Sequence, residues 1–274
     1  MKTTTKDAAP QAPLTPDPDK EKDRQYVTAL ARGLEVLRCF TRTTPVLGTA
    51  EIARMTGLPQ PTVWRLCYTL MKEGYLVQSG RGDKLRPDIP VLSLGYAAVA
   101  GTQVAELARA DMQAIALRHQ GAVSLGMRDG FNMVYLQRCQ GSAIILRDLD
   151  VGSRVPMASS ATGWAYMAAL GDVERETLYE QLRTVESARW PELLPKIKEA
   201  LSAFAHTGYV VNKGSLQGQI NAVAVPVRSD DNSVLMSLSA GGISQVFDDA
   251  KLKEVGAELK LLAARLAPAL TAQR

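Results

Sequence analysis

Apolar residues first recur at helical spacing near residue 26. Val27, Leu30, Leu34 and Leu37 are three or four positions apart, and charged residues mostly fall between them. This spacing puts the apolar side chains on one face, and it predicts a helix of about 16 residues beginning near Tyr26.

Two more amphipathic helices are predicted directly afterwards. Thr49 is the expected N-cap of a short helix that ends at Gly57. Pro61 suits the first position of the next helix, where no N–H is needed, and Gly74 is its expected end. Two short helices joined by about four residues predict a helix-turn-helix. The apolar face of the later helix consists of Val63, Leu66, Cys67, Leu70 and Met71.

A small hairpin follows. Tyr75-Leu76-Val77 and Lys84-Leu85-Arg86 flank the turn Ser79-Gly80-Arg81-Gly82-Asp83. A helix, a helix-turn-helix and a basic hairpin come in the order of a winged helix.

The remaining pattern predicts an α+β domain. Residues 89–119 are rich in Ala and Leu and predict two helices separated at Gly101-Thr102, of which the first is a linker. Short extended runs then alternate with helical ones, which favours a mainly antiparallel sheet with flanking helices. The strand candidates are Ala122–Met127, Met133–Arg138, Ala143–Arg147, Tyr209–Asn212, Ile220–Val227 and Val234–Ser239. The helix candidates are Ser160–Leu170, Val173–Thr184, Glu192–His206 and Asp248–Ala267.

These patterns define four regions. Residues 1–23 contain four prolines and, after Met1, a single large aliphatic residue (Leu14), so we expect a disordered tail. The winged helix-turn-helix is expected at 24–88, the linker helix at 89–103 and the sheet domain at 104–274.

The net charge of +4 is unevenly distributed. Residues 24–86 hold 10 Lys and Arg against 4 Asp and Glu, whereas the segments before and after each total −1. A local basic excess is either the footprint of a polyanion or an ordinary solvated surface. Its position on a winged helix favours double-stranded DNA as the partner.

Several protein classes are disfavoured. No stretch approaches the roughly 18–20 uncharged apolar residues of a membrane span, and the N-terminus lacks the apolar core of a secretory signal. Cys39, Cys67 and Cys139 are too scattered for a disulfide framework or a CxxC zinc site. With only His119 and His206, a His-rich metal site is not expected, and no cofactor is predicted. A reducing cytoplasm fits best.

The outward face of the third helix carries residue types that suit DNA. Arg and Lys contact phosphates or guanine edges, hydroxyls contact phosphates, and the Thr methyl group contacts thymine. The alternative is that Trp64 and Tyr68 pack against the first helix or the hairpin. Arg81 and Lys84, with Arg86 beyond, either contact phosphates or the minor groove from the wing or are simply solvated. The predicted DNA-contact residues are Thr62, Trp64, Arg65, Thr69, Arg81 and Lys84, with Arg65 first.

At this point the sequence resembles the IclR family of bacterial transcriptional regulators, and it does so over nearly everything from residue 25 onward. The segments that carry the resemblance are Tyr26–Leu37, Glu51–Pro59, Thr62–Leu66, Gly74–Leu76, Gly152–Pro156, Ala161–Gly163, Gly208–Tyr209 and Ala224–Val227. The opening helix is most similar to the branch that controls aromatic-acid catabolism. The chain departs from the family pattern at Pro61, Trp64, Trp164 and Ser215, which bears on target sequence and ligand more than on fold.

The resemblance implies a GAF-like effector-binding domain from about residue 105, a homodimer or homotetramer with the linker helix in the contact, and a pseudo-palindromic operator. It also implies that Met127 and Asn212 line the effector pocket. From the residues themselves, the helix N-terminus at Ala161 suits a carboxylate or is a plain Ser/Thr-capped end. Asn221, Ser237 and Ser239 are further pocket candidates, although alternation alone does not decide whether the two serines face the cavity or water.

An enzyme is not predicted, because GxSxG, GK[ST] and GxGxxG patterns are all missing from the sequence. Together with the resemblance, the sequence predicts a ligand-responsive DNA-binding regulator, activator or repressor, of genes for the catabolism of a small organic acid. The resemblance of the opening helix favours an aromatic acid. The alternative is a small-molecule sensor whose winged helix binds protein.

Overall fold

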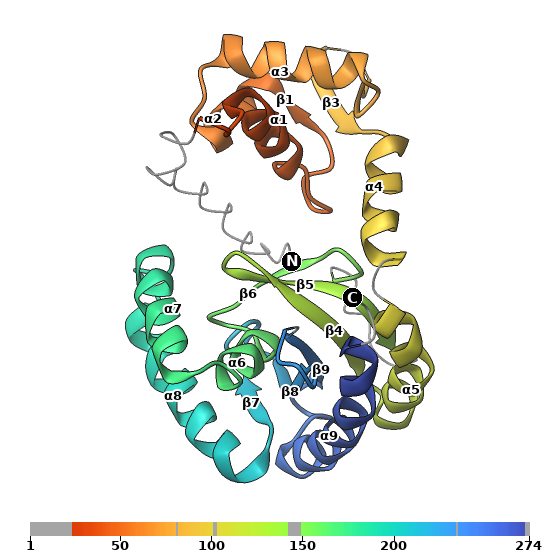
Figure 1. Ribbon diagram of the computed structural model, residues 1–274, viewed down its shortest axis with the longest axis vertical. Coiled ribbons are helices and arrows are strands. Elements are labelled where there is room, and N and C mark those ends of the chain that lie inside the picture. Colours follow the sequence, from red (N-terminus) through yellow and green to blue (C-terminus); the bar gives the residue numbers. More distant parts are fainter. Residues whose placement is uncertain (1–23, 81, 101–102, 142–148, 234, 272–274) are drawn as a thin grey trace, which may run out of the picture. The chain divides into compact units, whose positions relative to one another are not determined.

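The computed structural model describes residues 24–80, 82–100, 103–141, 149–233 and 235–271 (Figure 1). The chain divides into two compact units, one up to Ala97 and the other from Ala98. The tail expected at 1–23, the wing residue Arg81, the helix break at 101–102 and the strand expected at 143–147 lie outside the described residues.

The first unit contains helices and a small antiparallel sheet in the order β1-β3-β2. Leu47 pairs with Leu85, and Val77 pairs with Arg86, so β2 and β3 form the predicted wing. Its elements are α1 (Thr28–Arg38), β1 (Leu47–Gly48), α2 (Thr49–Thr56), α3 (Gln60–Lys72), β2 (Leu76–Gln78), β3 (Lys84–Pro87) and the beginning of α4 (Ile89–Ala100).

A single apolar cluster holds the first unit together. The predicted inward face of α3 is buried at Val63 and Cys67, and Leu66 and Leu70 pack against the same cluster. Burying such side chains contributes roughly 1.5–3 kcal/mol each relative to exposure. The buried members are Val36, Cys39, Leu47, Ile52, Val63, Cys67, Leu76 and Leu85.

The start of α2 differs from the prediction by one residue. Gly48 is the N-cap, and its N–H donates to the Glu51 carboxylate at 2.7 Å. Thr49 is already helical, and its hydroxyl donates to Asp83 at 3.5 Å instead. Helix α3 likewise begins at Gln60, so Pro61 lies within its first turn rather than at its first residue.

The second unit is built on a six-stranded antiparallel sheet in the order β6-β5-β4-β9-β8-β7. The central pair joins distant parts of the sequence, because Ser124 on β4 pairs with Ser239 on β9. The strands are β4 (Ala122–Asp129), β5 (Asn132–Gln140), β6 (Arg154–Pro156), β7 (Val210–Lys213), β8 (Ile220–Arg228) and β9 (Leu235–Ile243).

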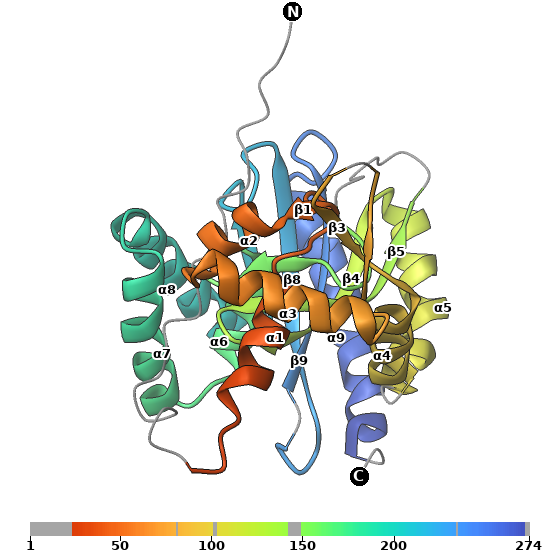
Figure 2. The ribbon, with the colours of Figure 1, turned by 90° about the horizontal axis from the view of Figure 1, so that it is seen from above.

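Helices cover both faces of this sheet, as Figure 2 shows: α5 and α9 lie on one side and α6, α7 and α8 on the other. Each side has its own apolar cluster. Trp164, one of the residues that depart from the family pattern, lies in the second cluster. Its indole N–H donates to the Ala158 carbonyl at 2.8 Å. The helices are α5 (Gln103–His119), α6 (Ala161–Ala168), α7 (Asp172–Val185), α8 (Trp190–Thr207) and α9 (Asp249–Thr271).

The predicted α+β class, with a winged helix-turn-helix before an antiparallel sheet domain, is confirmed. Strand β6 was not predicted, because three residues that end in Pro156 give no alternation to read. Within the described ranges, no single helix is long and apolar enough to cross a bilayer.

Candidate DNA-binding surface and ligand pocket

Helix α3 presents the predicted polar face to solvent. Trp64, Arg65, Thr69 and Lys72 are exposed, and Thr62 is partly exposed. The Thr69 hydroxyl donates to the Arg65 carbonyl at 3.0 Å, so its methyl group is the part left to contact a ligand. Within the described part of the chain, this face therefore presents the exposed guanidinium of Arg65, flanked by apolar and hydroxyl groups.

The two aromatic residues of α3 pack on each other. The rings of Trp64 and Tyr68 are stacked with centroids 5.4 Å apart, and both side chains are exposed, at 54% and 44%. The Lys72 ammonium lies 5.4 Å from the centroid of the Tyr68 ring. The alternative in which these rings pack against α1 or the hairpin is wrong, because the i, i+4 spacing on a helix brings them together at the surface.

The wing is tied to α2 through its charges. The Lys84 ammonium donates to the Glu51 carboxylate at 2.6 Å, and this hydrogen bond, followed by the one from the Gly48 N–H, lowers the pKa of Glu51. Lys84 thus has a structural partner as well as an exposed position. Arg86 forms a looser pair with Asp88 at 3.6 Å.

A pocket opens in the second unit between the sheet and the first turn of α6. Its cavity volume is about 50 Å³, below the roughly 300–1,000 Å³ of small-molecule sites, so a small organic ligand requires the wall to move outward. Among the residues that the structure describes, its wall contains one Arg and no Asp or Glu. The lining residues are Ala122, Ser124, Tyr135, Arg138, Leu149, Ser160, Ala161, Thr162, Asn212, Leu216, Gln217, Ile220, Ala222, Ser239, Ala240 and Gly241.

Arg138 is the dominant charge of this pocket. One of its terminal nitrogens donates to the Ser124 hydroxyl at 2.7 Å. Its Nε and Nη2 atoms are buried and have no hydrogen-bond partner among the described residues. Burial lowers the pKa of Arg138, which Tyr135 and Asp150 oppose. Unsatisfied buried donors on a cation are costly, so the site is suited to an anion that accepts from them.

A β-bulge places Arg138 in the pocket. The register of β4 and β5 shifts so that Leu125 pairs with Gln137 but Gly126 pairs with Tyr135. Residues 135 and 138 would face opposite sides of a regular strand, yet the extra residue lets both face the pocket. The Arg138 guanidinium carbon lies 5.5 Å from the centroid of the Tyr135 ring, and burial raises the pKa of Tyr135.

The first turn of α6 forms the opposite wall. Ser160 is the N-cap, and its hydroxyl accepts the Gly163 N–H at 3.1 Å. The Thr162 hydroxyl donates to the Ser239 hydroxyl at 3.0 Å, which fixes the helix end against β9. The N–H groups at the start of a helix lack intrahelical partners and carry a partial positive charge. Arg138 and this helix end therefore both favour an anion.

The structure brings together half of the predicted pocket residues. Ala161, Asn212 and Ser239 line the pocket. The Asn212 side chain donates to the Ser159 carbonyl at 3.0 Å and accepts the Ser215 N–H at 3.1 Å, so it fastens the wall rather than projecting free groups.

Met127, Asn221 and Ser237 lie outside the lining. Met127 packs against the cluster under α5 and α9, on the other face of the sheet. Asn221 alternates with the lining residues Ile220 and Ala222 and donates instead to the Phe247 carbonyl at 2.9 Å. Ser237 is fully buried, two positions before Ser239 along β9.

Comparison with known proteins gives consistent matches over most of the chain. The family described as "Bacterial transcriptional regulator IclR C-terminal" matches residues 96–267, and the "IclR helix-turn-helix domain" matches residues 29–80. The chain is 32% identical to the HTH-type transcriptional regulator TsaQ1/TsaQ2 of Comamonas testosteroni, covering 90% of this chain and 89% of that protein.

Solved structures resemble the chain as well. An IclR family transcriptional regulator from Brucella abortus is 38% identical, with a TM-score of 0.84 and coverage of 94% of this chain and 98% of that one. An IclR homologue from Microbacterium hydrocarbonoxydans, solved with 4-hydroxybenzoate, shares the fold at 22% identity, with a TM-score of 0.67 and coverage of 89% and 99%.

Proposed function

The chain belongs to the IclR family of bacterial transcriptional regulators, and from this premise we propose that it is a cytoplasmic regulator whose effector is a small aromatic carboxylate. Family members are ligand-responsive regulators rather than enzymes.

Arg138 carries this proposal. A carboxylate in the pocket accepts from the two guanidinium nitrogens that lack partners among the described residues, and it lies close to the first turn of α6. Hydrogen bonds between charged groups contribute about 1.5–3 kcal/mol, more than neutral ones. Ser239 and Thr162 supply hydroxyls for a second polar group of the ligand.

The apolar part of the wall supports an aromatic body for the ligand. Leu149, Leu216 and Ile220 line the pocket together with the Tyr135 ring. An aromatic ring is rigid, so the ligand loses little conformational freedom when the ring packs against these side chains. The Microbacterium homologue of the same fold, whose structure contains 4-hydroxybenzoate, gives a precedent for a ligand of this chemistry.

The DNA contacts are proposed on α3 and the wing. Arg65 reads a base edge or phosphate in the major groove, with Thr62, Trp64 and Thr69 beside it. Lys84 and Arg81 are proposed to contact phosphates at the wing, Lys84 by exchanging Glu51 for a phosphate.

A homodimer is proposed because each of two helices exposes an apolar face. The N-cap Val27 and the α1 residues Leu30 and Leu34 are 50–62% exposed, and on α4, Leu92 and Tyr96 are about 70% exposed. A two-fold dimer presents two winged helices to a pseudo-palindromic operator. The effector then shifts operator affinity through a coupling free energy of about 1–3 kcal/mol.

The effector proposal is tested by thermal unfolding with benzoate, 4-hydroxybenzoate, short aliphatic acids and the neutral amide benzamide. An aromatic acid at a hundred times its Kd stabilises by about 2.7 kcal/mol, and benzamide does not. Stabilisation by the amide as strongly as by the acid would remove the carboxylate from the proposal.

The DNA proposal is tested by binding to duplex DNA over a range of salt concentrations. A winged helix that neutralises several phosphates loses affinity steeply as salt rises. Weak binding with a flat salt dependence would instead support the alternative in which the winged helix binds protein.

A further inference from the structure

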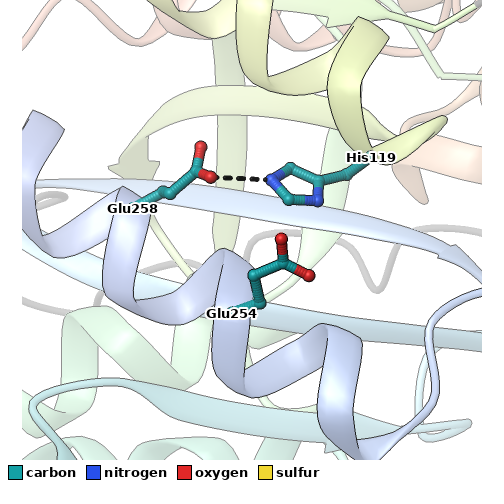
Figure 3. A group of neighbouring side chains, drawn as sticks. All are labelled: His119, Glu254 and Glu258. Atoms are coloured by element: carbon teal, nitrogen blue, oxygen red, sulfur yellow. Dashed lines mark hydrogen bonds and ion pairs between the residues drawn. The ribbon is translucent and has the colours of Figure 1, made fainter.

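Three potential metal ligands meet on the far side of the sheet from the pocket. His119 is the last residue of α5, and Glu254 and Glu258 project from α9 toward it (Figure 3). Each offers one ligand atom, and the three atoms all lie within 4.8 Å of one another. His119 and Glu254 are 135 positions apart in the sequence. None of the three side chains lines the proposed effector pocket or belongs to the proposed DNA surface.

Local geometry explains why these residues meet. Glu254 and Glu258 are four positions apart, so both carboxylates lie on one face of α9. The His119 side chain is only 1% exposed, and its Nε2 lies 3.1 Å from a Glu258 oxygen. In a tetrahedral site with metal bonds of about 2.0–2.1 Å, neighbouring ligand atoms are about 3.3 Å apart. The His119–Glu258 pair is already close to that separation.

The imidazole has unused bonding capacity. Its second nitrogen, Nδ1, is buried and has no hydrogen-bond partner among the described residues. A neutral imidazole has one N–H and one lone pair, and a single contact with Glu258 satisfies only one of them. With the ring proton on Nδ1, the lone pair of Nε2 points at the Glu258 carboxylate, and a divalent cation between the two groups turns that repulsive contact into two metal bonds.

Two basic side chains already contact the carboxylates, and their positions are compatible with a metal. Arg118 donates to the Glu258 oxygen that does not face His119, at 2.8 Å. A hydrogen bond of this kind orients a metal-binding carboxylate from outside the coordination shell. Lys251 pairs with Glu254 at 2.9 Å, but the Glu254 side chain is 54% exposed and can turn toward the ion.

We propose that His119, Glu254 and Glu258 bind one Zn²⁺ ion per chain, with water completing its coordination. One imidazole and two carboxylates suit zinc, whereas Mg²⁺ prefers an all-oxygen octahedron. Two carboxylates also balance the charge of the ion. The bound ion cross-links α5 and α9, the first and last helices that lie wholly in the second unit.

Calorimetric titration of the metal-free full chain with ZnCl₂ tests the proposal, with MgCl₂ as the comparison. We expect one Zn²⁺ per chain, no Mg²⁺ binding at the same concentrations, and a rise in Tm of about 5–10 °C at a hundredfold excess over the Kd. Glu254→Gln is expected to weaken zinc affinity at least tenfold. It is the main variant because its side chain is exposed and its loss leaves the core intact.

Matched controls are available in the same chain. Glu192→Gln removes an exposed helical carboxylate paired with Lys196 at 2.7 Å, much as Glu254 pairs with Lys251. His119→Gln is compared with His206→Gln, which changes the only other histidine. Zinc affinity that is unchanged in Glu254→Gln, or that falls equally in Glu192→Gln, overturns the proposal. The titration needs no effector or DNA, so its failure is separate from any failure of the proposed function.

Discussion

The polar side chains of the two proposed binding regions differ in their exposure and in their hydrogen-bond partners. On α3 and the wing the side chains are exposed and contact one another, as Trp64 does with Tyr68 and Lys84 with Glu51. In the pocket, Arg138 is largely buried, and two of its nitrogens have no partner among the described residues.

Because of this difference, substitutions in the two regions are expected to affect binding and the stability of the fold in different ways. A surface whose groups are solvated can lose one of them with little effect on the fold, because water replaces each lost contact. A buried wall is held in place by its surroundings, so added atoms destabilise the fold, whereas loss of its charge changes ligand binding rather than stability. Four substitutions test this difference between the pocket wall and the surface of α3 and the wing.

The largest expected effect is on the rigidity of the pocket wall. A Cβ at Gly163 would lie 2.1 Å from the Met157 carbonyl oxygen, which is backbone and cannot rotate away. Gly163→Ala should lower the free energy of unfolding by about 3 kcal/mol. Gly33→Ala, in α1 with nothing within 4 Å, should raise it by about 0.5–1 kcal/mol. Chemical denaturation measures both changes, and equal tolerance at the two sites would show that the pocket wall is no more rigid than the exposed face of α1.

Arg138→Gln should weaken binding of an aromatic carboxylate about tenfold to a hundredfold, since it removes about 1.5–3 kcal/mol of charged hydrogen bonding. The free protein should keep or slightly gain stability, because a buried cation with unpaired donors is removed. Ligand titration and melting without ligand measure the two effects. The control is Arg109→Gln, an exposed arginine on α5, and an equal loss there would assign the effect to net charge.

Arg65→Ala should weaken operator binding by about 1–2 kcal/mol, or roughly five- to thirtyfold, and leave the melting temperature unchanged. A mobility-shift assay and a thermal melt on the same sample measure both. Arg183→Ala removes the same charge from α7 in the other unit and should leave binding intact. A lower melting temperature for Arg65→Ala would contradict the view that this surface is independent of the fold.

The smallest effect concerns the contact between α2 and the wing. Lys84 and the Gly48 N–H lower the pKa of Glu51 from its ordinary value of 4.5. The unfolded chain therefore binds the proton more readily, so this contribution to stability is present above about pH 4.5 and is lost as the pH falls below it. Urea denaturation should show a shallower loss in acid for Glu51→Gln than for the native chain. Glu73→Gln, elsewhere in the first unit, should follow the native curve.

Helical periodicity made much of the fold and one of the two surfaces predictable. The inward set of α3 contains Val63 and Cys67 as expected, and the opposite face of that helix follows from the same period. Glycine also marked a helix end correctly, because Gly57 adopts the left-handed conformation (φ 69°) that ends α2.

The pocket was less predictable because alternation along a strand indicates which face of the sheet a side chain is on only where the strand is regular. Alternation groups Ser237 with Ser239, yet only Ser239 lines the pocket, together with its neighbour Ala240. The bulge in β5 also breaks the rule that would place Arg138 opposite Tyr135. Asn221 was expected in the pocket as a polar residue in an apolar strand, yet it faces the other side and caps the Phe247 carbonyl. The meeting of His119 with α9 depends on packing between distant segments, which leaves no local pattern.

The central pairing of β4 with β9 has a consequence for how the chain is made. These two neighbours in the sheet join Ala122–Met127 to residues near Leu238, more than a hundred positions later. Ribosomal synthesis delivers the winged helix first, and its contacts are local, so it can fold while the rest is still being translated. The sheet can close only after β9 has emerged, and until then β4 exposes an unpaired edge. A truncated transcript would therefore yield a DNA reader without a working sensor, and the C-terminal codons decide whether the regulator is controllable.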